Sequence, residues 1–415
     1  MEVAVLGAGM IGTSTALALQ ERGFDVTLID RTSPGRETSY GNAGVIQGEA
    51  YEPYAMPRDV RTLSRIVLRT DNGVNWDLRG LWHSAPSLFS YWRHSAPLQH
   101  REIGREYAQL IRRATNDHAK WIAASGSDAL ICRKGYRVAF RDNASFEAQL
   151  RNAERLRELY GADFESEDSA ALAAAEPALR RRLAGGIRWR DAWTCSDPGA
   201  LVQAYSDLFV SRGGKLLNFE IRRLEQAGSR WKVHTGAGTI DTAEVVVALG
   251  PWSPNLLAAL DYKVLMVPKR GYHLNFHYPA ECSTPRLNLP LLDASVAAIY
   301  SPMRAGLRIA TAADLSSFRQ GNVPRQMRRA EAAARELLEM GPAIETSVWT
   351  GVRPCMPDMM PVIGAAPRHR GLWFNFGHGH QGFTLGPTTG ELLAEAMDLG
   401  TTRSIPSMAA SRAFR

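Results

Sequence analysis

Three glycines close to the start of the chain have the types and spacing that bind a dinucleotide. Gly7, Gly9 and Gly12 form the pattern G-x-G-x-x-G, in which the first glycine permits a tight turn and the second lets the backbone approach a pyrophosphate. The third lets a helix pack closely on a strand, and the N-terminus of that helix stabilises the negative charge of the phosphates. The predicted binding loop also includes Met10 and Ile11, which lie between the last two glycines.

The segments around these glycines supply the elements that such a loop needs. Residues 2–6 are a short apolar run that predicts a buried parallel strand, residues 13–22 predict a helix, and residues 26–29 predict a second buried strand. Asp30 ends the second strand, where its carboxylate can accept hydrogen bonds from the ribose of an adenosine, and Arg31 follows it. This unit predicts a dinucleotide-binding domain, but it does not separate NAD from FAD.

The composition of the chain is that of an ordinary globular protein. Its 415 residues predict about two to three domains, and the 45% of hydrophobic and 22% of charged residues exclude a disordered chain, a collagen-like fibre and a coiled coil. No segment reaches the ~18 apolar residues of a membrane span, and the N-terminus lacks the cationic start of a signal peptide. We therefore expect a cytoplasmic protein.

The cysteines do not form a recognisable framework. None belongs to a C-x-x-C pair, so we expect neither a disulfide scaffold nor a cysteine-built zinc site. The four cysteines are Cys132, Cys195, Cys282 and Cys355.

The chain is basic, with a formal net charge of +7, six lysines and 43 arginines. Such a balance can indicate an anionic partner, such as a nucleic acid or a membrane surface. The alternative is a codon bias toward arginine. We favour this alternative and predict no nucleic-acid partner, because the arginines are scattered and form no run of five or more.

The rest of the chain alternates helical and strand-like segments. Apolar residues at three- and four-residue spacing predict helices at 101–124, 144–160, 198–211, 325–339 and 388–399. Strands are predicted at 135–140, 216–224, 231–235 and 244–249. The aromatic segment 51–100 is expected to be irregular.

This order of elements predicts an α/β fold of the α+β two-domain type. A Rossmann-type nucleotide-binding domain is left and rejoined several times, and a substrate-binding domain with an antiparallel sheet is inserted into it. The predicted segments of the first domain are 1–95, 186–255 and 346–415, and those of the second are 96–185 and 256–345.

Four further motifs carry a resemblance to a known family. They are Glu-Thr-Ser-Tyr-Gly-Asn-Ala-Gly at 37–44, Gly-Pro-Trp-Ser at 250–253, Thr-Gly-Val-Arg-Pro-x-x-Pro-Asp-x-x-Pro-Val-Ile-Gly at 350–364, and Asn-x-Gly-His-Gly-His-Gln-Gly at 375–382. In this order and at these distances they resemble the FAD-dependent D-amino-acid dehydrogenases. That family belongs with D-amino-acid oxidase, glycine oxidase and sarcosine oxidase. The resemblance covers essentially the whole chain and implies a bacterial flavoprotein of amino-acid catabolism.

The resemblance implies FAD bound in an extended form. The glycine loop would hold the pyrophosphate, Asp30 the adenosine ribose, and backbone N–H groups at 379–384 the negative charge of reduced flavin. Glycine and asparagine in the 39–44 loop tolerate a backbone close to the ligand. The further cofactor-binding residues implied are Ser39, Asn42, Ala43, Gly44, Gly250, Gly377, Gly379, His380, Gly382 and Thr384.

Two residues are implied in substrate binding. Arg353 falls where glycine oxidase and D-amino-acid oxidase place the arginine that clamps the substrate carboxylate, and a guanidinium offers a two-pronged match to that group. Tyr272 lies in a segment that borders the substrate cavity in the family, where the phenol can either contact substrate or pack. His378 and His380 lack a nearby third ligand, so we predict no metal site.

The implied reaction is the oxidation of a D-amino acid at its α-carbon. A hydride passes from Cα to flavin N5, and the imino acid hydrolyses to a keto acid and ammonia. The sequence reveals no dedicated general base. The electrons go to a quinone, another carrier or oxygen. Peripheral contact with the inner face of the membrane, through the arginines and the segment 51–100, is a hypothesis that accompanies a quinone acceptor.

Two departures from the family pattern shape these expectations. Gly351 stands where sarcosine oxidase-like relatives carry the cysteine that links flavin, so we expect non-covalent FAD. The segment 379–382 differs from the Gly-Thr-Leu-Gly of alanine-using members, which leaves the substrate open. The alternatives are a D-proline or D-hydroxyproline dehydrogenase, a sarcosine-type oxidase of N-methyl amino acids, and an FAD-binding subunit of a larger oxidase. An NAD-binding dehydrogenase remains as the alternative outside the family.

Overall fold

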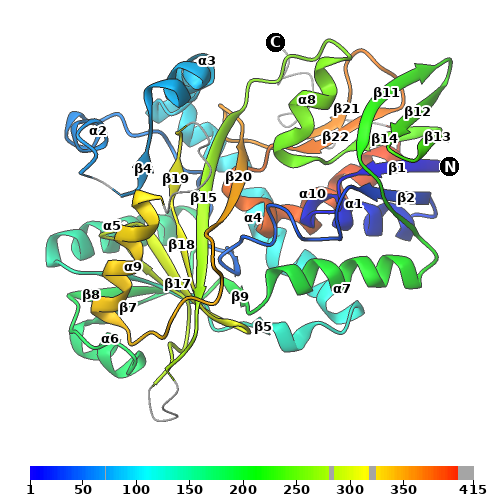
Figure 1. Cartoon of the computed structure of the whole chain (residues 1–415). Coiled ribbons are helices and arrows are strands. Elements are labelled where there is room, and N and C mark those ends of the chain that lie inside the picture. Colours follow the sequence, from blue (N-terminus) through cyan, green and yellow to red (C-terminus); the bar gives the residue numbers. More distant parts are fainter. Residues whose placement is uncertain (71, 280–284, 317–323, 401–415) are drawn as a thin grey trace.

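Two sheets lying side by side organise the molecule (Figure 1). The computed structural model describes residues 1–70, 72–279, 285–316 and 324–400. One sheet has six strands and carries the N-terminal glycine loop, and the other has ten strands. The long strand β15 (Val267–Phe276) runs through the middle of the molecule in Figure 1, with β20 (Trp349–Cys355) paired to it.

The six-stranded sheet is parallel except at one edge, where β21 runs antiparallel to β22. Its central strand is apolar, with residues 3–6 buried, as a strand covered on both faces requires. In spatial order the strands are β10 (Lys215–Asn218), β2 (Asp25–Asp30), β1 (Glu2–Leu6), β14 (Glu244–Val247), β22 (Leu372–Phe376) and β21 (Val362–Ala365).

Helices cover one face of this sheet and a small sheet covers the other (Figure 1). On the helical side α1 packs against α10 and α7, and α10 packs against α4. These helices are α1 (Met10–Glu21), α4 (Pro97–Ala124), α7 (Pro198–Ser211) and α10 (Gly382–Asp398). The opposite side carries β11 (Ile221–Ala227), β12 (Arg230–Thr235), β13 (Gly238–Thr242) and α8 (Ser253–Ala258).

The ten-stranded sheet is mostly antiparallel, with α9 (Arg325–Leu337) packed on β18 and β15. Near its other end α5 (Asn143–Tyr160) and α6 (Ser169–Ala175) pack on β8. Its strands, besides β15 and β20, are β4 (Val74–Asn75), β19 (Ala313–Asp314), β18 (Gly306–Thr311), β17 (Ala298–Met303), β16 (Leu291–Asp293), β6 (Tyr136–Phe140), β8 (Gly185–Trp189) and β7 (Phe164–Asp168).

The predicted α/β architecture, with a Rossmann-type sheet rejoined by distant segments and an added antiparallel sheet, is confirmed. The proposed domain boundaries stay a prediction. The strand pairing adds that β4, β20 and most of β8 come from residues assigned to the nucleotide-binding segments but hydrogen-bond within the ten-stranded sheet. Besides the sheet of β11, β12 and β13 there is a second three-stranded sheet, formed by β3 (Val45–Ile46), β9 (Trp193–Cys195) and β5 (Ile131–Cys132).

The expectation that residues 51–100 are irregular is wrong, because α2 (Val60–Val67) and α3 (Leu78–His94) form there. Each begins at an aspartate whose carboxylate accepts a backbone N–H, Asp59 from Thr62 and Asp77 from Gly80, both at 2.7 Å. The periodicity was hidden because α2 buries no residue completely and α3 buries mainly small ones. A proline inside α3 adds to the irregular look of its sequence.

Two other element boundaries differ from the prediction. The strand expected at 216–224 is divided into β10 and β11, which belong to different sheets. The last helix begins at Gly382 rather than at 388, although it contains Pro387. None of the helices in the described ranges combines the length and the apolar character needed to cross a bilayer. Of the cysteines, Cys132, Cys195 and Cys355 are free, and Cys282 lies outside the described residues.

A buried ion-pair network holds the ten-stranded sheet together. Arg137 on β6 contacts Glu167 at 2.8 Å and Glu176 at 2.6 Å, and all three side chains are 6% exposed or less. Glu176 also accepts the backbone N–H groups of Asn288 and Leu289, at 2.7 and 3.1 Å. Burial raises the pKa of Glu176, although Arg137 opposes the rise. Removing the arginine would leave two carboxylates buried without a cation.

We expect Arg137→Met to lower the free energy of unfolding by about 3–5 kcal/mol, the usual cost of breaking a buried ion pair. The control is Arg113→Met on α4, which breaks the exposed pair with Asp117 and should change stability by less than about 1 kcal/mol. Urea unfolding followed by tryptophan fluorescence measures both. Equal effects of the two substitutions would contradict the role given to the network.

Candidate active site

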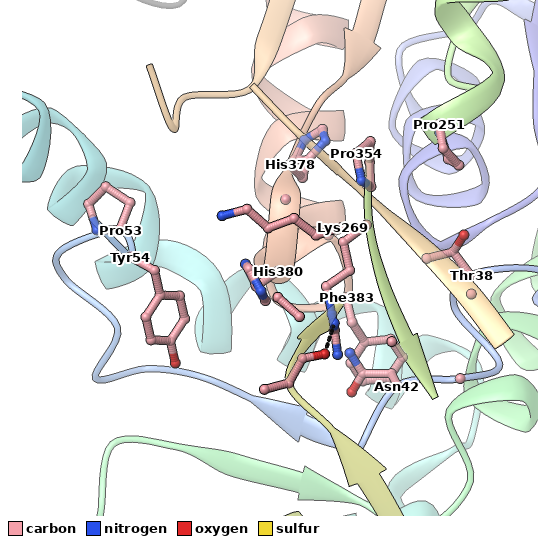
Figure 2. Close-up of a pocket in the computed structure, with 18 of the residues that line it drawn as sticks. Thr38, Asn42, Pro53, Tyr54, Pro251, Lys269, Pro354, His378, His380 and Phe383 are labelled. Atoms are coloured by element: carbon pink, nitrogen blue, oxygen red, sulfur yellow. Dashed lines mark hydrogen bonds between the residues drawn. The ribbon is translucent and has the colours of Figure 1, made fainter. Parts of the chain in front are cut away.

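A single cavity joins the glycine loop of the six-stranded sheet to the middle of the ten-stranded sheet. Its volume is about 1460 Å³, larger than the roughly 300–1,000 Å³ of a typical small-molecule site. Figure 2 shows its lining side chains arriving from segments that are far apart in the sequence. All of the predicted site residues except Gly12, Gly44 and Thr384 line it.

The glycine loop forms the nucleotide end of the cavity. Gly7 has φ +106°, and a Cβ there would lie 2.6 Å from the Ala248 carbonyl oxygen. A Cβ on Gly12 would lie 1.7 Å from the carbonyl oxygen of Gly7. Gly12 therefore acts where the sequence predicted, between helix and strand, and not on the cavity wall. Gly9, Met10 and Ile11 face the cavity.

Asp30 lies at the carboxyl end of β2 and organises this loop as well as lining it. Its two carboxylate oxygens accept the backbone N–H groups of Ala8, at 2.6 Å, and Thr32, at 3.1 Å. Burial raises the pKa of Asp30, and these hydrogen bonds oppose the rise. The guanidinium carbon of Arg31 lies 4.6 Å from the centre of the Trp252 ring, and the guanidinium pairs with Glu37 at 2.7 Å. Arg31 lines the cavity together with Asp30.

The 39–44 loop is fixed to the start of α1. The hydroxyl of Ser39 accepts the backbone N–H of Met10 at 3.0 Å, and the side chain of Asn42 accepts that of Gly44 at 2.8 Å. Gly44 has φ +74°, and a Cβ there would lie 2.2 Å from the Cys195 carbonyl oxygen, so this glycine serves packing. Ser39, Asn42 and Ala43 face the cavity. Gly250, with φ +54°, also lines it, at the start of the short helix η2 (Gly250–Trp252).

The loop before α10 lines the other side. Gly377 and Gly379 both have positive φ, of +84° and +58°, and they line the cavity with His380 and Gly382. Thr384 is buried outside the lining, where its hydroxyl accepts the backbone N–H of Gln47 at 3.1 Å.

Burial disfavours the charged form of both histidines of this loop. Burial lowers the pKa of His378 to about 3 and that of His380 well below its usual value. Neutral imidazoles are possible metal ligands, yet the residues that the structure describes contain no group of three His, Cys, Asp or Glu that could hold a metal ion.

Arg353, on β20, reaches the cavity wall beside Gly271 of β15. Its Nη1 donates to the Ala312 carbonyl at 2.8 Å and, at 3.3 Å, to that of Arg270; its Nη2 donates to the Thr311 carbonyl at 2.9 Å. These bonds leave Nε–H and one N–H of Nη2 for a ligand. Burial lowers the pKa of the guanidinium.

Tyr272 lines the cavity, but its hydroxyl is already engaged. It donates to Asp314 at 2.8 Å, and burial together with the charge of Asp314 raises the pKa of the phenol. Its ring packs beside the hydrophobic core of the ten-stranded sheet. The packing role that the sequence left open for Tyr272 therefore has direct contacts to support it.

Several cavity residues were not found from the sequence. Lys269 on β15 is 9% exposed, and its ammonium nitrogen lies 4.1 Å from the centre of the Tyr91 ring. Tyr54 packs edge-on against His380, with ring centres 5.2 Å apart, and Figure 2 shows both side chains and Lys269 around one space. Glu49 lines the cavity as well. Lys269 and Glu49 belong to none of the sequence motifs, so nothing in the sequence indicated their place in the site. For Tyr54 the one sign was its position ten residues after the 39–44 loop.

These residues fit FAD. The cradle at Gly7 and Gly12 has no room for a Cβ, as the approach of a strand, a helix and a pyrophosphate requires. Asp30, the 39–44 loop and the loop before α10, to which the sequence assigned the adenosine, the pyrophosphate and the flavin, all line this one cavity.

Comparisons with known proteins agree with this geometry. Residues 2–396 match the family model described as DAO, FAD dependent oxidoreductase. The chain is 29% identical to the D-amino-acid oxidase of Bradyrhizobium diazoefficiens over 97% of this chain and 96% of that protein. It is 30% identical to a D-amino acid dehydrogenase of Xylella fastidiosa over 95% and 91% of the two chains. The crystal structure of glycine oxidase from Geobacillus kaustophilus superposes with a TM-score of 0.72, at 19% identity, over 99% of this chain and 98% of that one.

The chain belongs to this family of FAD-dependent oxidoreductases. The prediction of FAD is thereby confirmed, and the alternative of an NAD-binding dehydrogenase is excluded. The superposition with glycine oxidase confirms the fold.

We expect Gly12→Val to abolish FAD binding, because its Cβ would collide with the Gly7 carbonyl and force α1 away from β1. The purified variant should lack the visible absorbance of bound flavin. Gly236→Ala is the matched control, since the nearest atom to its added Cβ is 3.8 Å away. Circular dichroism checks that both variants fold, and flavin retained at the normal ratio in a folded Gly12→Val would contradict the assignment.

Proposed function

We propose that this protein oxidises a D-amino acid to its imino acid, which hydrolyses to a keto acid and ammonia. The observation that carries the proposal is Arg353, a half-buried guanidinium on the wall of the cavity that the glycine loop also lines, with two N–H groups left over from its bonds to backbone carbonyls. FAD, when bound, accepts a hydride from the α-carbon of the substrate. The names of the Bradyrhizobium and Xylella relatives support the choice of D-amino acids.

The contribution of this chain is placement. Arg353 holds the substrate carboxylate through its Nε–H and Nη2–H, the two-pronged arrangement that fixes both position and orientation. Its hydrogen bonds to three backbone carbonyls hold the guanidinium in one position, so that it does not shift when the substrate moves. A reacting carbon held in one orientation gains much of its rate from that orientation alone.

We propose that FAD is bound without a covalent link. Gly351, where a flavin-linking cysteine would stand, lies against the ring of Trp349, and a Cβ there would be 2.0 Å from it. A Cβ added to Gly41 would lie 1.8 Å from the same Trp349 ring. A cysteine at 351 therefore has no room. Acid precipitation should release all of the flavin into the supernatant.

Arg353→Ala should lower kcat/KM for the best D-amino acid at least about 100-fold, because it removes two charge-assisted hydrogen bonds to the carboxylate. Flavin content should be unchanged, since Arg353 does not touch the glycine loop. Steady-state kinetics with a panel that includes D-alanine, D-proline, D-hydroxyproline and sarcosine measures the effect and identifies the substrate. Arg370→Ala, at the surface turn before β22, serves as the control. An unchanged kcat/KM in Arg353→Ala would discard the anchor.

For the electron acceptor we propose a membrane quinone reached through α2 and α3. Both helices lie at the outside of the molecule in Figure 1. Their exposed apolar side chains form what we call the apolar helix surface: Val60, Val67, Leu68, Leu78, Trp82 and Phe89. The same segment carries exposed arginines, among them Arg58, Arg61, Arg79 and Arg93. Aromatic and aliphatic side chains flanked by arginine are typical of surfaces that lie on anionic membranes.

The same two helices also line the cavity from inside. Leu63 and Ile66 of α2 and Leu81 and Leu88 of α3 face it. A lipid-soluble acceptor held at the apolar helix surface would therefore have an apolar route to the flavin end of the site.

The double variant Trp82→Asp, Phe89→Asp should bind vesicles containing anionic phospholipid at least about tenfold more weakly, because two exposed aromatic side chains that enter the lipid contribute several kcal/mol. Vesicle co-sedimentation measures this binding, which should also weaken with salt. Leu159→Asp, an exposed leucine on α5, is the control. Equal binding of the wild type to anionic and zwitterionic vesicles, or no loss in the double variant, would contradict the membrane contact.

A further inference from the structure

Glu49 is a buried carboxylate with one oxygen that has no partner. It follows β3, its side chain is 4% exposed, and it lines the cavity. Oε1 accepts hydrogen bonds from Gln47 Nε2 at 2.7 Å and from the Tyr136 hydroxyl at 2.9 Å. Oε2 is buried and makes no hydrogen bond to any described residue. Such a group is costly, and in a native protein it requires an explanation.

Three other carboxylates of the cavity have their partners within the protein, and a further one, Glu220, is exposed to solvent. Both oxygens of Asp30 accept backbone N–H groups, and Glu37 pairs with Arg31. Glu52 is bonded to Arg155 at 2.7 Å and to the Tyr160 hydroxyl at 3.0 Å. Among the described residues no cation forms an ion pair with Glu49. A glutamine at this position could accept the same two hydrogen bonds, so the local structure does not explain why the residue is an acid.

The contacts of Glu49 connect it to the flavin end of the site. Gln47, which donates to it, accepts a hydrogen bond from Gln381 Nε2 at 2.7 Å. Gln381 belongs to the loop before α10, between His380 and Gly382 on the cavity wall. Glu49 is therefore one side chain away from the loop that the sequence assigned to the flavin.

Glu49 and Arg353 line the same cavity. Burial raises the pKa of the Tyr54 phenol. The charge of Glu49 raises this pKa further, and the charge of Arg353 lowers it. An α-amino acid carries its ammonium group one carbon away from its carboxylate. Arg353 and Glu49 carry the opposite charges that the two ends of such a zwitterion require.

We propose that Glu49 binds the α-ammonium group of the substrate through Oε2 and takes one proton from it, so that the amine is neutral when the hydride leaves the α-carbon. This inference rests on the proposed function. The balance is complete: the carboxylate becomes a carboxylic acid, and the nitrogen keeps an electron pair. That pair forms the C=N bond as Cα–H departs with its own two electrons to FAD. The acid returns its proton to solvent after the product leaves.

The protonation of Glu49 suits this role. Burial raises its pKa to about 7, so at neutral pH the group can both accept and release a proton. The groups that face it are Gln47, Tyr136 of β6 and Asp191, whose negative charge adds to the rise. Tyr51 and Tyr54 also feel its charge. Below pH 7 the carboxyl group holds a proton and cannot take one from the substrate.

The test is the rate of flavin reduction by a D-amino acid under nitrogen, measured on the holoenzyme by stopped flow as a function of pH. The wild-type rate should rise through about pH 7 and then level off. In Glu49→Gln the rate at pH 7 should fall about 100-fold, the size of a typical acid–base contribution. The rise should move to higher pH, toward the pKa of the free substrate ammonium. Glu52→Gln, in the same cavity, should keep the wild-type profile.

Three further measurements separate a loss of the proton acceptor from a loss of folding, of FAD or of the proposed activity. Flavin content and the melting temperature of Glu49→Gln at pH 8 should not be lower than in wild type. The reason is that an acid with a raised pKa destabilises the fold above that pKa, and glutamine removes this cost. Wild-type flavin reduction by D-amino acids tests the proposed function independently of Glu49. A normal pH profile in Glu49→Gln, or a loss confined to KM for D-lysine and D-arginine, would overturn the inference.

Discussion

Two positive side chains stand directly opposite each other where β20 pairs with β15. Arg353 is the partner of Lys269 in this register, so both leave neighbouring strands on the same face of the sheet. Neither forms an ion pair with any residue in the described part of the chain, and both line the cavity. Like charges in this arrangement repel, and taking them out of water adds to the cost. A bound anion would remove both penalties, so this register suits the carboxylate of the proposed substrate.

The charges of Lys269 and Arg353 also affect an ionisable group near them. His380 lies close enough for both cations to lower its pKa in addition to burial, which makes it a neutral group at the flavin end. The negative charge of Glu49 and the positive charge of Arg353 act on Tyr54 with opposite effects. The cavity therefore contains both cationic and anionic side chains, as the proposed zwitterionic substrate requires. Its lining also includes the apolar residues Val138, Phe140 and Ile299.

The parts of the site that could be predicted are those that local sequence determines. The glycine loop and Asp30 belong to one strand–helix–strand unit of thirty residues, so their spacing along the chain nearly equals their arrangement in space. Arg353 was predicted because it stands within a long motif. Lys269 and Glu49 could not be, because each acquires its role from a partner far along the chain: Lys269 from the pairing of β15 with β20, and Glu49 from Tyr136. Helices α2 and α3 escaped prediction because they bury little apolar surface.

The order in which the chain visits its sheets has a consequence for assembly during synthesis. The strand β1, which begins the nucleotide loop, pairs with β2 nearby but also with β14, about 240 residues later, and β14 in turn pairs with β22. The helix α1 packs against α10, the last helix described. The first thirty residues must therefore wait, incompletely covered, until almost the whole chain has left the ribosome. Long-range pairings of this kind slow folding, so acquisition of the prosthetic group is a late event in the maturation of this protein.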